Sequence, residues 1–240
     1  MNDPRAVHFG IRLCISLAIP FLLGVSGVRL LLSEQFLQFE YRRPGFPADV
    51  YGFSVEDRLH YGAHAINYLF NAEPINYLAA LRLAGEKCWN PAAGATDCAL
   101  FSERELRHMA DVKRTTAVAF ALAAVCAVVG VAITFASRFN EGLRAHIVVA
   151  IRRGCNLTLL SVAFLAVLSR AAWDRAFDAF HGLFFAEGSW RFPFSDSLIR
   201  LYPEQLFIDA ALLLAIYVSL CAVSLLCFLS LWDRRARRQI

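Results

Sequence analysis

Charged side chains are scarce in this 240-residue chain, making up 18% of it against ~25% in an average soluble domain. Hydrophobic residues make up 58%, an excess that excludes a disordered chain and disfavours an ordinary soluble enzyme. Several catalytic signatures are also absent: there is no C-x-x-C pair, phosphate-binding glycine loop, dinucleotide fingerprint or G-x-S-x-G elbow. These absences argue against a membrane thiol oxidoreductase and against the nucleotide-binding and hydrolase classes that use such motifs.

The hydrophobic residues come in unbroken blocks. Crossing ~30 Å of hydrocarbon takes ~20 helical residues, and stretches of about this length lie at 13-32, 115-136, 154-169 and 210-232. The third is short, but Arg153 and Arg170 bracket it, and their long side chains can reach the interface. No small-x-small cleavage site follows the first, so we expect an uncleaved anchor. The sequence therefore predicts an all-α membrane protein, a single membrane domain over 1-240 with four transmembrane helices.

The segments outside the spans differ in charge. The N-terminal flank, the loop between spans two and three, and the tail together hold ten basic and three acidic residues, whereas loops 33-111 and 173-207 hold ten basic and sixteen acidic ones. Because cytoplasmic segments retain positive charge during insertion, we predict that both termini are cytoplasmic and both loops extracytoplasmic. The basic tail is expected to contact anionic membrane lipid and not nucleic acid.

Loop 33-111 is too long for a simple connection and predicts a mostly helical extracytoplasmic cap between helices 1 and 2. Two capping boxes mark helix starts within it, at Ser54 with Asp57 and at Ser102 with Glu105. The first helix is expected over 55-70, with an apolar stripe that comprises Leu59, Ala63, Ile66 and Phe70. The second is expected to start near residue 103 and to continue into span two.

Two cysteines fall in this cap, at the ends of the stretch CWNPAAGATDC. Its Asn, Pro and Gly residues favour a turn that could bring the ends together, and an outer compartment permits oxidation. We therefore predict a disulfide between Cys88 and Cys98.

Two histidines have neighbours suited to chemistry. His108 stands just before span two with Asp111 three residues ahead, where a carboxylate can orient an imidazole. His181 lies in the aromatic-rich loop 173-207, and apolar surroundings would keep its imidazole neutral and usable as a base. A structural role stays open for each, because polar turns and satisfied histidines are common at membrane interfaces. Further charges near the outer span boundaries suggest a polar site there: Arg29, Arg170, Asp209, Arg191 and Arg200.

A zinc-dependent hydrolase is a further alternative. His60 and His64 stand four residues apart on a predicted helix, a spacing that can offer two nitrogen ligands to zinc. The intervening Tyr-Gly-Ala lacks the glutamate of the metalloprotease motif, so we expect no metal. This alternative would recruit His108 or His181 as a further ligand and predicts stoichiometric zinc and sensitivity to chelators.

Three stretches carry a resemblance to a known family: DRLHYGAHAINYL (57-69), ERELRHMADVK (103-113) and FHGLFFAEGSWRFPFSDSLIRLYPEQLF (180-207). In these stretches, and in topology over nearly its whole length, the chain resembles the lipoprotein intramolecular transacylase (Lit) family of four-span membrane proteins. Residues 72-100 have no counterpart in the resemblance. It implies a bacterial inner-membrane protein whose active site lies at the outer leaflet.

The resemblance implies an acyl shift on bacterial lipoproteins. The sn-2 acyl chain of the S-diacylglyceryl cysteine would move to the α-amine of that cysteine, giving the lyso form, and no cofactor is needed. The family's two central histidines correspond to His108 and His181. We expect His181 to be the general base and His108, oriented by Asp111, to be the partner acid or oxyanion donor, and the reverse assignment of the two histidines stays open. Within the resembling stretches the expected substrate-binding residues are Arg191, Arg200, Trp190, Asp196, Tyr202 and Arg58.

A different class of function remains compatible with these residues. A non-enzymatic membrane protein could bind a lipid or protein partner through its cap, with both histidines in structural or pH-sensing roles. It predicts intact function after histidine-to-glutamine changes. The sequence makes no prediction of oligomeric state.

Overall fold

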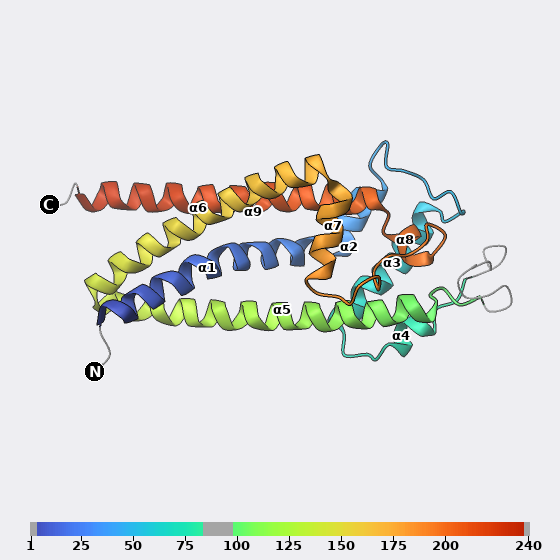
Figure 1. Cartoon of the computed structure of the whole chain (residues 1–240), viewed down its shortest axis with the longest axis horizontal. Helices are drawn as coiled ribbons and strands as arrows, with labels where there is room; N and C mark the ends of the chain where they lie inside the picture. The colour runs from blue at the N-terminus through green and yellow to red at the C-terminus, as the bar shows by residue number, and fades with distance from the viewer. Residues whose placement is uncertain (1–3, 84–97, 238–240) are drawn as a thin grey trace. The chain divides into compact units, whose positions relative to one another are not determined.

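The computed structural model describes residues 4-83 and 98-237, and within these ranges every regular element is a helix (Figure 1). One isolated antiparallel bridge joins Arg82 to Ala99. A 3-10 turn, Ser137–Phe139, separates two of the long helices. The α-helices are α1 (Pro4–Leu31), α2 (Glu34–Tyr41), α3 (Val55–Phe70), α4 (Asn76–Ala79), α5 (Glu103–Ala136), α6 (Glu141–Ala171), α7 (Trp173–Gly182), α8 (Ser197–Leu201) and α9 (Glu204–Arg237).

In the described parts of the chain, four helical segments are long and apolar enough to cross a membrane, and they confirm the predicted fold class: Val7–Leu31, Glu103–Phe139, Glu141–Ala171 and Glu204–Arg235. The third helix starts well before residue 154, so most of the predicted basic loop is helical. The Asn140 side chain caps its start by accepting a hydrogen bond from the Leu143 N–H at 3.0 Å. Further along α6, Arg152 pairs with Asp233 at 2.7 Å, which stabilises the arginine within the helix.

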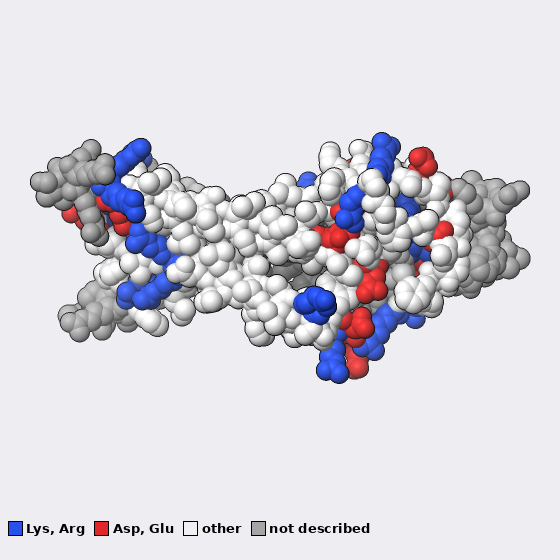
Figure 2. Space-filling model, turned by 90° about the horizontal axis from the view of Figure 1, so that it is seen from above, with Lys and Arg blue, Asp and Glu red and all other residues white. Residues whose placement is uncertain are grey.

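The chain divides into two compact units, which we call the membrane unit (1-28, 120-173 and 212-240) and the cap unit (29-119 and 174-211). In the membrane unit, small side chains allow close helix packing. Ser16 Oγ donates to the Ala150 carbonyl at 3.1 Å, and Ser26 Oγ lies 3.2 Å from the Tyr217 hydroxyl. On the face seen in Figure 2, charged side chains are absent along most of this unit, and Lys and Arg gather at one end of it.

At Gly154 the helix backbone packs closely against the backbone of α1. A Cβ added there would lie 2.7 Å from the Ile19 Cβ and 3.0 Å from the Ser16 carbonyl oxygen. We expect Gly154→Ala to lower the free energy of unfolding by about 1–3 kcal/mol, because overpacking displaces the helix backbone. Gly130→Ala is the matched control: nothing lies within 4 Å of its Cβ position, so alanine there should be neutral or slightly stabilising. Thermal unfolding in detergent measures both, and equal midpoints for the two variants would contradict the packing argument.

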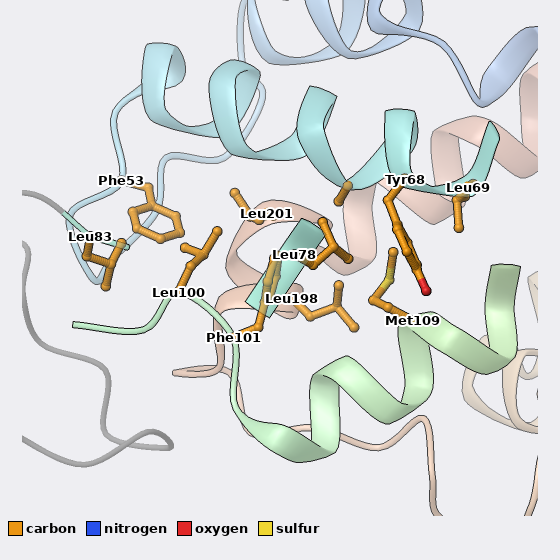
Figure 3. Packing of buried hydrophobic residues seen from close by; sticks show 11 residues of the cluster. Phe53, Tyr68, Leu69, Leu78, Leu83, Leu100, Phe101, Met109, Leu198 and Leu201 are labelled. Atoms are coloured by element: carbon orange, nitrogen blue, oxygen red, sulfur yellow. The ribbon is translucent and has the colours of Figure 1, made fainter. Parts of the chain in front are cut away.

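The cap unit has its own hydrophobic core between α3, α4, α8 and the first turns of α5 (Figure 3). Leu78, Leu100 and Leu201 are completely buried at its centre. Both predicted capping boxes are present. The Asp57 N–H donates to Ser54 Oγ while Asp57 accepts from the Ser54 N–H, and the pair Ser102 and Glu105 is bonded in the same way. These caps fix where the two helices start.

The predicted apolar stripe of α3 is correct only in part: Ile66 is buried, Leu59 and Ala63 are half-buried, and Phe70 is exposed. The helix has the expected bounds, but its buried face consists of Arg58, Gly62, Ala65, Ile66, Tyr68 and Leu69. Phe70 is 39% exposed, and the Arg29 guanidinium lies 4.3 Å from its ring centroid. The buried face includes Gly62, where an added Cβ would lie 3.1 Å from Leu37 Cδ1, and Arg58, whose side chain finds hydrogen-bond partners inside the cap unit.

The predicted Cys88–Cys98 disulfide involves Cys88, which lies outside the described residues, and it stays a prediction. The five cysteines of the apolar spans are free thiols: Cys14, Cys126, Cys155, Cys221 and Cys227.

Candidate active site

His181 lies near the end of α7 within an aromatic cluster of the cap unit. Its ring centroid is 4.0 Å from that of Phe177, 5.9 Å from that of Phe185 and 5.7 Å from that of Trp190, which stacks on it at 27°. Its Nδ1 lies 2.8 Å from the Phe177 carbonyl oxygen. Because a carbonyl can only accept, Nδ1 carries the proton, and Nε2 of the neutral ring presents the lone pair.

The electrostatic surroundings of His181 favour this neutral form. Burial lowers its pKa below the ordinary value of 6.5, opposed by the Phe177 carbonyl and by the Asp178 charge. Asp178 makes no hydrogen bond to the ring. Its carboxylate accepts from Trp190 Nε1 at 2.9 Å and from Arg191 at 2.6 Å and 3.2 Å, and these bonds lower the pKa of Asp178. Asp178 therefore holds the indole that stacks on His181.

His108 lies on the first turns of α5 and is 8% exposed. Its ring makes edge contacts with Phe185 at 5.1 Å and with Phe192 at 5.5 Å. Phe185 touches both imidazoles, so the structure brings His108 and His181 to one aromatic cluster. The Nδ1 atom of His108 is buried and has no hydrogen-bond partner among the residues that the structure describes. A buried imidazole with an unused nitrogen is available to a bound substrate.

Asp111 does not make the hydrogen bond to His108 that its spacing suggested. Its carboxylate lies 3.5 Å from Arg114, three residues further along α5. His108 faces the aromatic side chains, whereas Asp111 and Arg114 pair where both are substantially exposed. A three-residue spacing permits the contact between His108 and Asp111, but the competing arginine and the aromatic packing decide against it.

A buried carboxylate ties the helix of His108 to α8, which lies within the aromatic-rich loop 173-207. Glu105 is completely buried and accepts hydrogen bonds from the Ser102 N–H, the Ser102 hydroxyl and the Leu198 N–H at 2.7–2.8 Å. Nearby, Asp196 is buried and pairs with Arg104 at 3.3 Å. These bonds fix the start of α8 against the start of α5.

We expect Glu105→Ala to lower the free energy of unfolding by about 3 kcal/mol or more, because two backbone N–H groups lose a charged acceptor inside the core. Glu103→Ala is the matched control. Glu103 stands two residues earlier on the same helix, its side chain is 92% exposed, and its partner Arg107 is exposed as well, so its loss should cost little. Chemical denaturation in detergent compares the two variants. Similar losses of stability for both would show that Glu105 does not act as a link.

The remaining predicted substrate-binding residues lie in different surroundings. Trp190 and Arg191 belong to the aromatic cluster through Asp178. Arg58 and Arg200 are both 4% exposed and line a separate cavity whose described lining includes neither histidine. Tyr202 donates its hydroxyl to the Gly62 carbonyl at 2.7 Å, which is a packing role. The structure thus divides the predicted site residues between two places in the cap unit.

The sequence of the chain matches one protein family over most of its length. Residues 12-207 fit the family model described as lipoprotein intramolecular transacylase Lit. The chain belongs to the Lit family. An uncharacterized protein of Aquifex aeolicus (strain VF5) is 31% identical to it over 207 residues, which is 86% of this chain and 87% of that protein.

Solved structures from the Lit family share the fold. They are in meso structures of the membrane integral lipoprotein intramolecular transacylase Lit from Bacillus cereus. A variant with one histidine changed to arginine gives a TM-score of 0.67 at 18% identity and covers 98% of this chain and 96% of that one. A variant with histidine changed to alanine gives a TM-score of 0.65 at 16% identity and covers 97% of this chain and 96% of that one. A third structure gives a TM-score of 0.62 at 19% identity and covers 96% of this chain and 99% of that one.

The structure offers no support for the zinc alternative. The rings of His60 and His64 lie 5.2 Å apart, but they pack against Tyr61 and Tyr77. Over 4-83 and 98-237, no group of three or more His, Cys, Asp or Glu side chains could hold a metal ion. Among the described residues, the ring contacts of His60 and His64 involve neither His108 nor His181.

Sequence reasoning missed several residues that shape the site in this Lit-family chain. Phe185 and Phe192 were visible only as members of an aromatic run, and no periodicity marked them as contacts of His108. Glu105 was recognised as a helix cap, which gave no sign of its bond to Leu198, 93 residues away in sequence. The side-chain partners of Asp178 and Arg104 are likewise long-range or cross-loop contacts.

Proposed function

We propose that this chain is an intramolecular transacylase that moves the sn-2 acyl chain of a diacylglyceryl lipoprotein to the α-amine of its N-terminal cysteine. Membership of the Lit family supports the reaction class. The observation that carries the proposal is the pair of imidazoles on Phe185, one with a defined tautomer and one with an unpaired nitrogen. The charge distribution of the loops supports cytoplasmic termini and an extracytoplasmic cap. Family membership supports a bacterial inner-membrane protein whose site lies at the outer leaflet.

The chemistry needs three events that these groups can supply. His181 Nε2 takes a proton from the ammonium, and the free amine attacks the ester carbonyl. The oxyanion of the tetrahedral intermediate accepts a hydrogen bond from the His108 imidazole N–H. The bond between the carbonyl carbon and the glyceryl oxygen then breaks, that oxygen takes the proton held by His181, and the attacking nitrogen releases its second proton to water, which leaves a neutral amide. Nucleophile and ester belong to one molecule, so positioning replaces an acyl-enzyme.

The neighbours of the two histidines have positioning roles in this proposal. Trp190, held by Asp178, keeps the His181 ring in its plane. Arg191 neutralises Asp178, and Asp196 fixes the segment that ends at α8 through Arg104. Asp111 acts on His108 through its charge alone. The acyl chains would lie among the exposed aromatic side chains Phe180 and Phe184.

Expression in a bacterial host that lacks lipoprotein N-acylation tests this function. Mass spectrometry of lipoprotein N-termini should show an N-acyl, S-monoacylglyceryl cysteine in cells that carry the chain. Cells with an empty vector should keep the free amine. A free amine in both, with the protein present in the membrane, would refute the transacylase and favour a non-enzymatic binding role for the cap.

The pH dependence of the reaction follows from the lowered pKa of His181. The neutral imidazole is the active form, so the rate should rise with pH and level off, with a midpoint below 6.5. The same shift makes the unfolded state bind the proton more readily, so this group's contribution to stability declines as the pH falls below 6.5. Initial rates on a synthetic lipopeptide, taken at about ten pH values between about 4.5 and 8.5, would measure the midpoint. A midpoint above 6.5 would exclude His181 in its observed surroundings as the base.

A further inference from the structure

The cap unit contains a cavity of about 410 Å³ that the proposed reaction does not use. Loop residues 47-51, Arg58 of α3, Arg200 of α8 and the first turns of α9 line it. A volume of this size suits a small molecule and exceeds what a single inorganic ion needs. From its charge and its walls we propose that this cavity binds a phosphate-bearing lipid headgroup, and that Arg58 is its main anion contact.

The hydrogen bonds of Arg58 hold the guanidinium without neutralising it. Its Nε donates to the Arg200 carbonyl at 2.9 Å and one Nη to the Pro47 carbonyl at 2.7 Å, so both acceptors are uncharged backbone groups. Among the described residues, no carboxylate lies within ion-pair distance of it. Burying a positive charge without a directly paired counter-ion is costly: burial lowers the pKa of Arg58, and the charge of the nearby Asp49 offsets this only in part. An anion in the adjoining cavity would remove this cost.

Arg200 differs because its charge is already balanced. Its Nε and one Nη donate to the Asp49 carboxylate at 3.1 Å, and the same Nη also donates to the Tyr51 carbonyl. The Phe53 ring lies 3.6 Å from its guanidinium carbon. The lining as a whole holds two guanidinium groups and the carboxylates of Asp49 and Glu204, a net charge of zero. Glu204 is exposed, so among the buried lining groups the Arg58 charge is the one that no carboxylate pairs with. Guanidinium groups bind phosphate oxygens through paired, charge-assisted hydrogen bonds.

The other walls favour a lipid over a free anion. Apolar side chains line much of the cavity: Val50, Phe194, Ile199, Pro203 and Ile208. Three lining residues, Glu204, Gln205 and Ile208, belong to the start of α9, the helix of a candidate membrane span. Ile208 precedes the apolar run that begins at residue 210 by two positions, or ~3 Å of helix rise. That is the depth at which a lipid phosphate meets hydrocarbon.

Native mass spectrometry of the full chain in detergent can test the proposal with three probes. They are a short-chain phosphatidylglycerol, the diacylglycerol with the same chains, and inorganic phosphate. We expect one saturable phosphatidylglycerol site, with diacylglycerol and phosphate each binding at least about tenfold more weakly. Phosphate that binds as tightly as the lipid would identify a free-anion site, and diacylglycerol that binds equally would identify an apolar site; either result overturns the proposal.

Variants assign the binding to this cavity. Arg58→Gln removes the charge and should weaken phosphatidylglycerol binding on the order of tenfold or more. Val50 is 89% exposed in the lining loop, so Val50→Glu should weaken binding and Val50→Lys strengthen it without disturbing the core. Ala72→Glu adds the same charge at an exposed position outside the cavity lining and should leave binding unchanged. Equal affinity for Val50→Glu, Val50→Lys and the native chain would refute the assignment, even if Arg58→Gln fails to fold.

Discussion

Replacing His181 with glutamine should reduce acyl transfer on the order of 100- to 10,000-fold, the contribution of a positioned general base. Glutamine keeps a polar amide of similar size but has no lone pair that can take a proton at neutral pH. The loss should fall on kcat as well as kcat/KM, because the group acts on the reacting amine. Single-turnover conversion of a synthetic diacylglyceryl lipopeptide, followed by mass spectrometry, measures it.

His60→Gln is the matched control for this change. His60 is an exposed histidine of the same cap unit whose ring contacts only Tyr61 and His64 among the described aromatic neighbours. It should retain the native rate, whereas the zinc alternative requires it to lose activity. A fewfold loss in His181→Gln, or equal losses in both variants, would remove His181 from the proposed role.

Replacing His108 with phenylalanine should lower the activity of the protein and raise its stability. Acyl transfer should fall on the order of 100- to 1,000-fold, the usual cost of losing an oxyanion donor. Thermal stability should rise, because the change removes a buried Nδ1 that has no partner in the described structure and places an aromatic ring among Phe185 and Phe192. The gain is about 1 kcal/mol, the lower end of the cost of an unsatisfied buried polar group.

The two measurements use the same purified protein: a melting curve in detergent and the lipopeptide conversion assay. Leu106→Phe is the control for adding an aromatic ring to this helix. Leu106 is partly buried and lies within one helical turn of His108. It should change activity little. A His108→Phe protein that is less stable than the native chain, or as active, would show that the unpaired nitrogen is not reserved for substrate.

The helices of this protein could be predicted because their signals are local. The capping box at Ser54 and Asp57 gave both the start of α3 and, with the apolar pattern, its length. The apolar runs gave four spans because hydrocarbon thickness sets a minimum length. The family resemblance selected His108 and His181, and the structure places both on Phe185.

The partners of the site residues could not be predicted in the same way. Asp178 and Asp111 each stand three residues from a histidine, yet Asp178 bonds Trp190 and Arg191, and Asp111 pairs with Arg114. Helical spacing shows which contacts are possible, whereas competing donors decide which form. The burial of the Arg58 side chain could not be predicted for a similar reason, because its hydrogen-bond acceptors are the backbone carbonyls of Pro47 and Arg200.

In the proposed mechanism, the bond between His181 and the Phe177 carbonyl would couple the chemistry of the base to the folding of α7. The acceptor is a backbone atom four residues earlier, so it is in position only while that turn of helix is formed. A side-chain substitution at residue 177 leaves this acceptor in place, whereas fraying of the last turn would release the ring and allow its proton to move to Nε2. The lone pair would then lie on Nδ1 and no longer on Nε2, the atom assigned to the substrate amine, although the residues of the site are unchanged. In the proposed mechanism, the local helix–coil equilibrium of the ten residues of α7 would therefore set the fraction of molecules whose base is ready to react.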